Sequence, residues 1–157
     1  VDFRTMSNYL EHGITDVTAE VTQTAMGALG ERMGIKLTRA TVDSEGRASI
    51  SATMPVEGNT QPYGLLHGGA SAVLAETLGS VAAAITAYHQ MGEGVMVVGI
   101  DLNCTHHKAA RDGVVTGVAH MIGTGRTIMS SEIVITNEQG ERVCTARLTA
   151  LARTPRT

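Results

Sequence analysis

The chain has 157 residues, of which 43% are hydrophobic, and its formal net charge at pH 7 is −3. This length suits one domain with a substantial core, and this hydrophobic content excludes a disordered chain. Aromatic residues make up only 3% and Trp is absent. The chain therefore lacks the basic excess and the stacking side chains typical of general nucleic-acid binders, and we expect no nucleic-acid partner.

The two cysteines, Cys104 and Cys144, are far apart in the sequence and have no metal-ligand spacing. We expect them to be ordinary strand residues in a reducing compartment, and we expect no metal site. The N-terminus lacks the basic-then-apolar pattern of a signal peptide. No uninterrupted apolar run is expected to reach membrane-spanning length. These features predict a soluble cytoplasmic protein without a membrane partner.

The first predicted elements follow an N-terminal arm at residues 1–18, which has mixed polarity and little periodicity. A helix is expected over residues 19–33, interrupted by Gly27 and Gly30. Residues 35–42 are β-branched and half polar. The segment GRASISATM, which ends at Met54, alternates apolar and polar residues as a half-buried strand does. Two strands are therefore expected before the loop PVEGNTQPYG, which is marked by Pro, Gly and Asn.

A long helix is predicted from Gly69 to Tyr88, and the segment HQMGEG ends it. The next strand, VMVVGIDLN, carries apolar residues that are expected to share one face: Met96, Val98, Ile100 and Leu102. Three further strands are expected, with NEQG as the turn before the last of them, at residues 113–122, 127–136 and 142–152. The tail at residues 153–157 is expected to fray.

This order of elements indicates an α+β domain. Runs of strands joined by short turns must be largely antiparallel, because parallel neighbours need long crossovers. One long helix packed against an antiparallel sheet satisfies this pattern. No internal repeat or linker divides the chain. We expect a single domain over residues 19–152, with a sheet of five to six strands.

The predicted long helix has no truly polar face. Large aliphatic residues recur at helical spacing and should pack on the sheet: Leu74, Leu78, Val81 and Ile85. Another face carries small residues around one carboxylate: Ala72, Glu76, Gly79, Ser80 and Ala83. One sheet cannot cover a helix on all sides. A second body, most simply a second subunit, should therefore cover the small-residue face.

Glu76 is a candidate catalytic group. Burying an ionised carboxylate without partners is costly, so a carboxylate in such a helix points to a base or a nucleophile. Ser80 lies one turn further on and is placed to hydrogen-bond Glu76 or a shared water. The alternative is that Glu76 lies at a solvent-exposed edge of the helix and contributes only to solubility.

The segment His67-Gly68-Gly69 opens the predicted helix. The first N–H groups of a helix have no internal partners and can stabilise a developing oxyanion. Glycine lets a ligand approach the backbone closely. The alternative is a tight loop-to-helix turn with a capping or packing histidine. The combination of donors, a histidine and a carboxylate nine positions on favours a catalytic site.

A basic stretch, CTHHKAARDG at residues 104–113, lies between two predicted strands. Adjacent histidines do not easily share a metal ion, and no third ligand lies near them in the sequence. The stretch is either a solvated loop or a phosphate clamp. The segment GTGRT at residues 123–127 adds Arg126 to a flexible turn, but it lacks the spacing of a P-loop.

The segment QPYGLLHGGASAVLAETLGS, residues 61–80, resembles the signature of glutamate-dependent hotdog-fold acyl-CoA thioesterases. That group includes the 4-hydroxybenzoyl-CoA and 1,4-dihydroxy-2-naphthoyl-CoA thioesterases and the enterobactin proofreading thioesterase. The resemblance covers residues 26–152, most of the chain. It implies a central helix wrapped by an antiparallel sheet. It also implies assembly as a homodimer or homotetramer, with the active site at the dimer interface.

The resemblance also implies residue roles. Glu76 matches the catalytic carboxylate, acting as nucleophile or as general base on water, and the Gly68 N–H matches the group that polarises the thioester carbonyl. His67 and Gln61 match residues that position the thioester and help the product leave, and Ser80 matches a hydroxyl that orients water. Contacts with the CoA arm and its phosphates are implied for Gly99, His106, His107, Lys108, Ala109, Gly123, Thr124, Gly125 and Arg126.

Two features depart from this pattern. Lys108 stands where close relatives often carry Arg, which keeps the charge but loses the bidentate geometry. The GTGR loop differs from the phosphate-contacting loops of the nearest relatives. Both departures concern the CoA phosphates and not the reacting centre.

The expected function is hydrolysis of an acyl-CoA to free acid and CoA, with an aromatic acyl group preferred. A thioester carbonyl is a good electrophile, so oxyanion donors and an activated carboxylate suffice, and no cofactor is needed. The substrate is an acyl-CoA or an acyl-carrier-protein thioester, since both present pantetheine. Two alternatives stay open: a related hotdog hydratase or dehydratase, and a non-catalytic acyl-CoA-binding protein.

Overall fold

The computed structural model describes residues 13–22 and 25–154. The elements follow one another in this order: β1 (Thr15–Asp16), α1 (Thr18–Thr22), α2 (Ala28–Arg32), β2 (Lys36–Val42), β3 (Ala48–Pro55), α3 (Gly68–Met91), β4 (Met96–His106), β5 (Val114–Thr124), β6 (Ile128–Thr136) and β7 (Arg142–Arg153).

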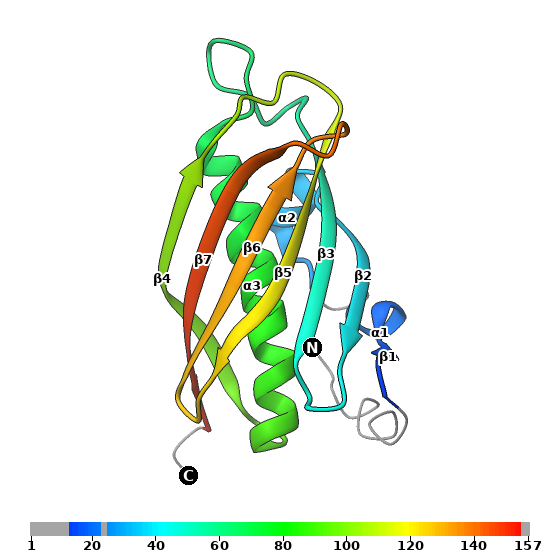
Figure 1. Ribbon diagram of the computed structural model, residues 1–157, viewed down its shortest axis with the longest axis vertical. Helices are drawn as coiled ribbons and strands as arrows, with labels where there is room; N and C mark the ends of the chain where they lie inside the picture. The colour runs from blue at the N-terminus through cyan, green and yellow to red at the C-terminus, as the bar shows by residue number, and fades with distance from the viewer. Residues whose placement is uncertain (1–12, 23–24, 155–157) are drawn as a thin grey trace.

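The strands form one sheet in the order β1-β2-β3-β5-β6-β7-β4, with every neighbouring pair antiparallel. The sheet curves around α3, which runs along its length (Figure 1). The short α1 contacts β2, and α2 contacts α3. The predicted α+β architecture with a long central helix is confirmed. The described sheet has seven strands, more than the five to six expected, and the two-residue β1 is one of them.

Local sequence explains most of the element boundaries. In β3 the buried residues alternate with half-buried ones, as the pattern ending at Met54 predicts. The helix expected over residues 19–33 is instead two short helices, and Gly27 lies in extended backbone just before α2. The long helix begins at Gly68 and continues to Met91, three residues beyond the predicted end. Gly92 follows with φ +82°, a conformation that suits glycine and stops a helix.

The β4 strand differs from its predicted pattern. Gly99 and Asp101 lie opposite consecutive residues of β7, so Ile100 is an extra residue in a β-bulge. The bulge interrupts the alternation, and Leu102 turns toward the core. Three apolar residues of the strand remain more than half exposed: Met96, Val98 and Ile100. The prediction that all four apolar residues share one face is therefore wrong.

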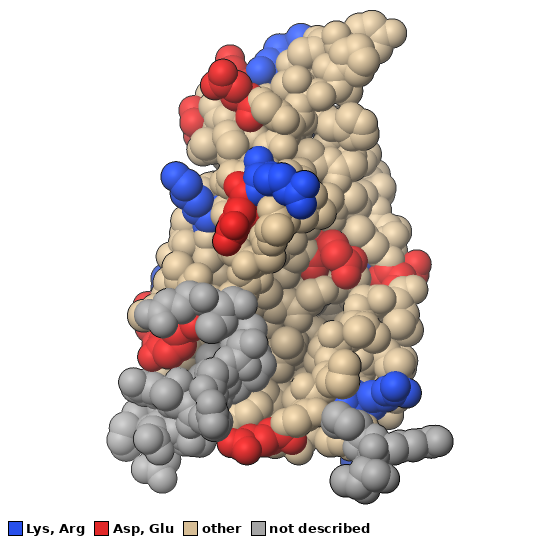
Figure 2. Space-filling model, turned by 180° about the vertical axis from the view of Figure 1, so that it is seen from behind, with Lys and Arg blue, Asp and Glu red and all other residues tan. Residues whose placement is uncertain are grey.

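The core lies between α3 and the concave face of the sheet. Leu74, Leu78 and Ile85 are fully buried there, as their spacing predicts. Gly79 and Ala83, which were expected on the small-residue face, are also buried against the sheet. The half-buried side of α3 instead carries Ala72, Val73, Glu76, Thr77, Ser80 and Ala84. Figure 2 views the molecule from the helix side, where charged residues are sparse.

The composition of α3 bears on the membrane prediction. By length and composition this helix is apolar enough to cross a membrane. The apolar run in α3 is not uninterrupted, because Glu76 lies within it. In the fold, 61% of the most apolar part of α3 is buried inside the domain, which is the environment of a core helix.

The two ends of the chain are described in part. Of the arm expected at residues 1–18, the structure describes residues 13–18, and the other arm residues lie outside the description. Thr15 and Asp16 pair with β2, and Val17 is buried in the core. At the other end β7 extends to Arg153, and residues 155–157 lie outside the described residues.

Candidate active site

The N-terminus of α3 presents an unengaged backbone donor. His67 is the N-cap, in extended backbone, and its Nδ1 accepts a hydrogen bond of 2.8 Å from the Gly69 N–H. The Gly68 N–H donates no hydrogen bond to any of the described residues. An N–H at this position adds to the positive end of the helix dipole. It is therefore available to an incoming anion or carbonyl oxygen.

His106 lies against the Cα of Gly68. A Cβ built on Gly68 would be 2.9 Å from His106 Nε2, so the imidazole packs against the Gly68 backbone in a space that only glycine leaves open. His106 ends β4, which brings the end of that strand to the start of α3. Sequence reasoning assigned His106 to the CoA arm. The structure places it next to the Gly68 backbone.

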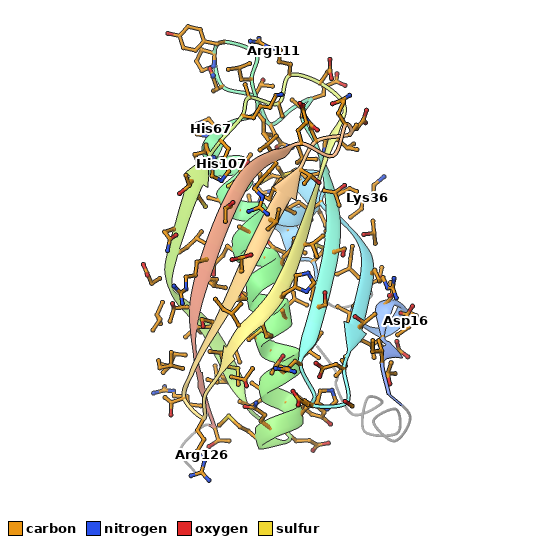
Figure 3. The ribbon with its side chains drawn as sticks, in the orientation of Figure 1. Asp16, Lys36, His67, His107, Arg111 and Arg126 are labelled. Carbon is orange, nitrogen blue, oxygen red and sulfur yellow. The ribbon has the colours of Figure 1, made fainter. Side chains whose placement is uncertain are left out.

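A cavity of about 320 Å³ opens beside Gly68 and His106. Figure 3 shows His67 and His107 at this same end of the molecule. Ser71, a buried residue one turn beyond His67, also lines the cavity, although sequence reasoning missed it. Its position four residues after the N-cap residue His67 could have predicted that it lies on the same side of the helix start. Six of the predicted site residues line the cavity: Gln61, Gly68, His106, His107, Lys108 and Ala109.

Gln61 is held in a tight turn at the edge of the cavity. Its Oε1 accepts a hydrogen bond of 2.6 Å from the Tyr63 N–H, and its carbonyl oxygen accepts one of 3.0 Å from the Gly64 N–H. Gly64 has φ +73°, which permits this turn. Because the amide oxygen of Gln61 is engaged, its Nε2 is the end of the side chain that can donate to a ligand.

Glu76 lies elsewhere on α3, against the edge strand. Ser80 Oγ donates a hydrogen bond of 3.2 Å to Glu76 Oε1, as the spacing of the two residues predicts. A Cβ built on Gly99 of β4 would overlap the same carboxylate oxygen. Gly99 therefore leaves the space that the Glu76 carboxylate occupies. In a single chain Glu76 is half-buried and not enclosed.

One chain does not bring the predicted catalytic residues together. Glu76 does not line the cavity that holds Gln61 and Gly68. Glu76 lies eight positions after Gly68 in the helix, which corresponds to about 12 Å along the axis. The fold instead produces two groups along the same side: the helix start with Gln61 and His106, and the carboxylate with Ser80 and Gly99.

The predicted phosphate contacts are also divided. Lys108 Nζ forms an ion pair of 2.5 Å with Glu141 Oε1, a partner that sequence reasoning missed. Hydrogen bonds from Lys108 and then Asn137 lower the pKa of the Glu141 carboxyl. His107 Nε2 lies 2.8 Å from Thr145 Oγ1. The remaining predicted contacts, Gly123, Thr124, Gly125 and Arg126, lie around the opposite end of the sheet, as the labels of Figure 3 show.

The two thiols are poor candidates for nucleophiles. Cys104 and Cys144 are free and lie on the neighbouring strands β4 and β7, as expected of strand residues. Burial raises the pKa of Cys104, and burial together with the adjacent Cys104 raises the pKa of Cys144 to about 12. Both are therefore protonated at neutral pH. Within the described part of the chain, no group of three or more His, Cys, Asp or Glu side chains could hold a metal ion.

The chain is similar to known thioesterases. A family model described as the Thioesterase superfamily matches residues 63–144. The proofreading thioesterase EntH of Cronobacter turicensis is 48% identical over 126 residues, which are 80% of this chain and 85% of the relative. EntH of Cronobacter sakazakii is 47% identical over the same shares of the two chains.

Solved structures show the same relationship. Thioesterase HI1161 from Haemophilus influenzae superposes with a TM-score of 0.76 at 35% identity, covering 89% of this chain and 92% of the other. A mutant of thioesterase PA1618 from Pseudomonas aeruginosa gives 0.74 at 35% identity, covering 86% and 92%. The resemblance to hotdog-fold thioesterases is thereby confirmed. The chain belongs to the thioesterase superfamily, whose members hydrolyse thioester bonds.

Proposed function

We propose that the protein hydrolyses an acyl-CoA or acyl-carrier-protein thioester with an aromatic acyl group, and that Glu76 and the Gly68 N–H carry out the reaction. The observation that supports this most is the unengaged Gly68 N–H at the start of α3. Gly68 lines a cavity, and His106 lines the same cavity beside it. The named relatives are proofreading thioesterases. No cofactor is required, and we place the reaction in the cytoplasm, where free thiols such as Cys104 persist.

The proposed chemistry uses each group once. The thioester carbonyl oxygen accepts a hydrogen bond from the Gly68 N–H, and the helix dipole stabilises the oxyanion as it forms. The Glu76 carboxylate attacks the carbonyl carbon or removes a proton from water that attacks it. Gln61 donates through Nε2 to hold the thioester, since its Oε1 is engaged by Tyr63. Ser80 orients the carboxylate through its hydrogen bond.

The separation of Glu76 from Gly68 requires two copies of the chain in this proposal. The edge strand β4 has an unpaired side and exposed apolar residues. Two copies that pair antiparallel along β4, about a two-fold axis near its middle, place Gly99 of one copy opposite His106 of the other. The carboxylate beside Gly99 then faces the partner's helix start. A two-fold axis forms this site twice, so the proposal includes at least a homodimer.

The first test is thiol release from a panel of acyl-CoAs, measured with a thiol-reactive dye. We expect turnover of benzoyl-CoA and hydroxybenzoyl-CoA, with kcat/KM at least about tenfold above that of hexanoyl-CoA. A pocket shaped for a rigid aryl group stabilises the transition state of an aryl ester more than that of a flexible alkyl ester. Preference for hexanoyl-CoA contradicts the aromatic assignment. Binding of acyl-CoA without thiol release makes the protein a binding module, and hydration of an enoyl-CoA makes it a hydratase.

Replacement of Gly99 by Ala tests how the carboxylate is positioned. The new Cβ overlaps Glu76 Oε1 and lies 3.2 Å from Leu148 Cδ1, so the carboxylate must move. We expect kcat for the best aryl-CoA to fall by about 10- to 100-fold with KM little changed, since small displacements of a reacting group are costly. Gly27→Ala is the matched control, because a Cβ there meets nothing within 4 Å. Equal activity of the two variants contradicts the positioning role.

A further inference from the structure

The two histidines near the helix start have different hydrogen-bonding roles. His67 Nδ1 accepts from the Gly69 N–H, so the ring proton of His67 is on Nε2 and the side chain serves as a helix cap. The His106 side chain has no hydrogen bond or ion pair with another residue in the described ranges, although its backbone belongs to the β4–β7 ladder. Its side chain is exposed and lines the cavity, with Nε2 directed over Gly68. The His106 imidazole is therefore available to contact a ligand in the cavity.

Two of the other polar side chains of the cavity already have partners. The Lys108 ammonium is paired with Glu141, and the His107 ring is bonded to Thr145. The Gln61 amide has no acidic proton. A thioester that breaks at this site leaves negative charge on sulfur, and its protonation lowers the barrier to departure. Among the described residues that line the cavity, His106 is an imidazole without a side-chain partner and lies against Gly68, so it is the candidate to supply that proton.

We propose, on the basis of the proposed function, that His106 protonates the departing thiol. The thioester carbonyl lies against the Gly68 N–H, and its sulfur lies beside His106 Nε2. As the tetrahedral intermediate collapses, the C–S bond breaks and its electron pair moves to sulfur, while the Nε2 proton of the imidazolium passes to that sulfur. The water that supplies the new C–O bond loses a proton, which returns to His106 through solvent. Thioester and water thus give acid and thiol, with His106 restored.

This role differs from a CoA contact in a measurable way. Loss of a phosphate or pantetheine contact raises KM for every CoA ester. Loss of a proton donor lowers kcat, and only for leaving groups that need the proton. An arylthiolate such as 4-nitrothiophenolate is stable enough to leave unprotonated. Two esters of the same acid therefore separate the two roles.

The test is His106→Gln, assayed with benzoyl-CoA and with the 4-nitrothiophenyl ester of benzoic acid. We expect kcat for benzoyl-CoA to fall by about 100-fold, as loss of a general acid predicts, and kcat for the nitrothiophenyl ester to stay within about threefold of wild type. His106→Ala should show the same contrast between the two esters. His120→Gln is the matched control, since His120 bonds Ser49 outside the cavity and should leave both rates unchanged.

The outcomes are distinguishable. Equal loss on both esters overturns the proposal in favour of positioning or folding, which the melting curves of the variants would reveal. A rise in KM alone also overturns it and restores His106 to the CoA arm. Wild-type protein that releases no thiol from either ester overturns the proposed function itself, and the role of His106 with it.

Discussion

Replacement of Glu76 by Gln is expected to lower kcat for the best aryl-CoA by about 1,000-fold. The variant keeps the shape of the side chain and can still accept the hydrogen bond from Ser80. It cannot remove a proton from water or form an acyl intermediate. Single-turnover thiol release gives the chemical step, and calorimetric binding of a non-hydrolysable thioether analogue should give an affinity within about threefold of wild type.

The control for this variant is Glu132→Gln, which makes the same chemical change on an exposed position of β6. It should retain wild-type kcat. If Glu76→Gln keeps more than about a tenth of the activity, the carboxylate is neither nucleophile nor essential base. If affinity for the analogue is lost as well, Glu76 contributes to binding, and the catalytic assignment fails.

Mixing two inactive variants should restore activity if the site forms between two chains. Gly68→Pro is the second parent. Proline removes the N–H, suits the first position of a helix and follows a residue that is already extended, His67 with ψ 130°. Random pairing with Glu76→Gln chains makes half of the dimers mixed, and each mixed dimer has one site with both wild-type groups. After the two are unfolded and refolded together, we expect about a quarter of wild-type activity.

Each parent refolded by itself is the control, and both should stay inactive. Gly68→Ala serves as a second control, because it adds the same Cβ against His106 but keeps the N–H. Mixtures that show no more activity than their parents, although mixed dimers are detected by mass spectrometry, would mean that Glu76 and Gly68 act within one chain. The two-copy arrangement would then be wrong.

Much of the fold follows from local pattern. The β3 alternation and the spacing of Leu74, Leu78 and Ile85 predict buried faces that the structure contains. The bulge at Ile100 could not be predicted, because it depends on which β7 residues lie opposite. Apolar alternation alone treats β4 as regular. Such non-local pairing is what a single-sequence reading lacks.

The candidate site shows the same division. The Ser80 hydrogen bond to Glu76 connects residues one helical turn apart, so spacing predicts it. The contact of His106 with Gly68 joins the end of β4 to the start of α3, and the Lys108 pair with Glu141 spans two loops. These contacts depend on the packed fold. From residue type alone, His106 and Lys108 belong to one basic stretch. The fold gives them different neighbours, since His106 contacts Gly68 and Lys108 pairs with Glu141.

The bulge in β4 also constrains how this strand can change during evolution. Gly99 and His106 are an odd number of positions apart, so a regular strand would point them to opposite faces. The extra residue Ile100 brings both to the inner face, where one contacts the Glu76 carboxylate and the other the Gly68 backbone. A descendant protein that loses Ile100 keeps Gly99 and His106 on the inner face of the strand. One that gains or loses a residue between Leu102 and His106 turns either Gly99 or His106 outward, so this part of the strand does not tolerate a change of length.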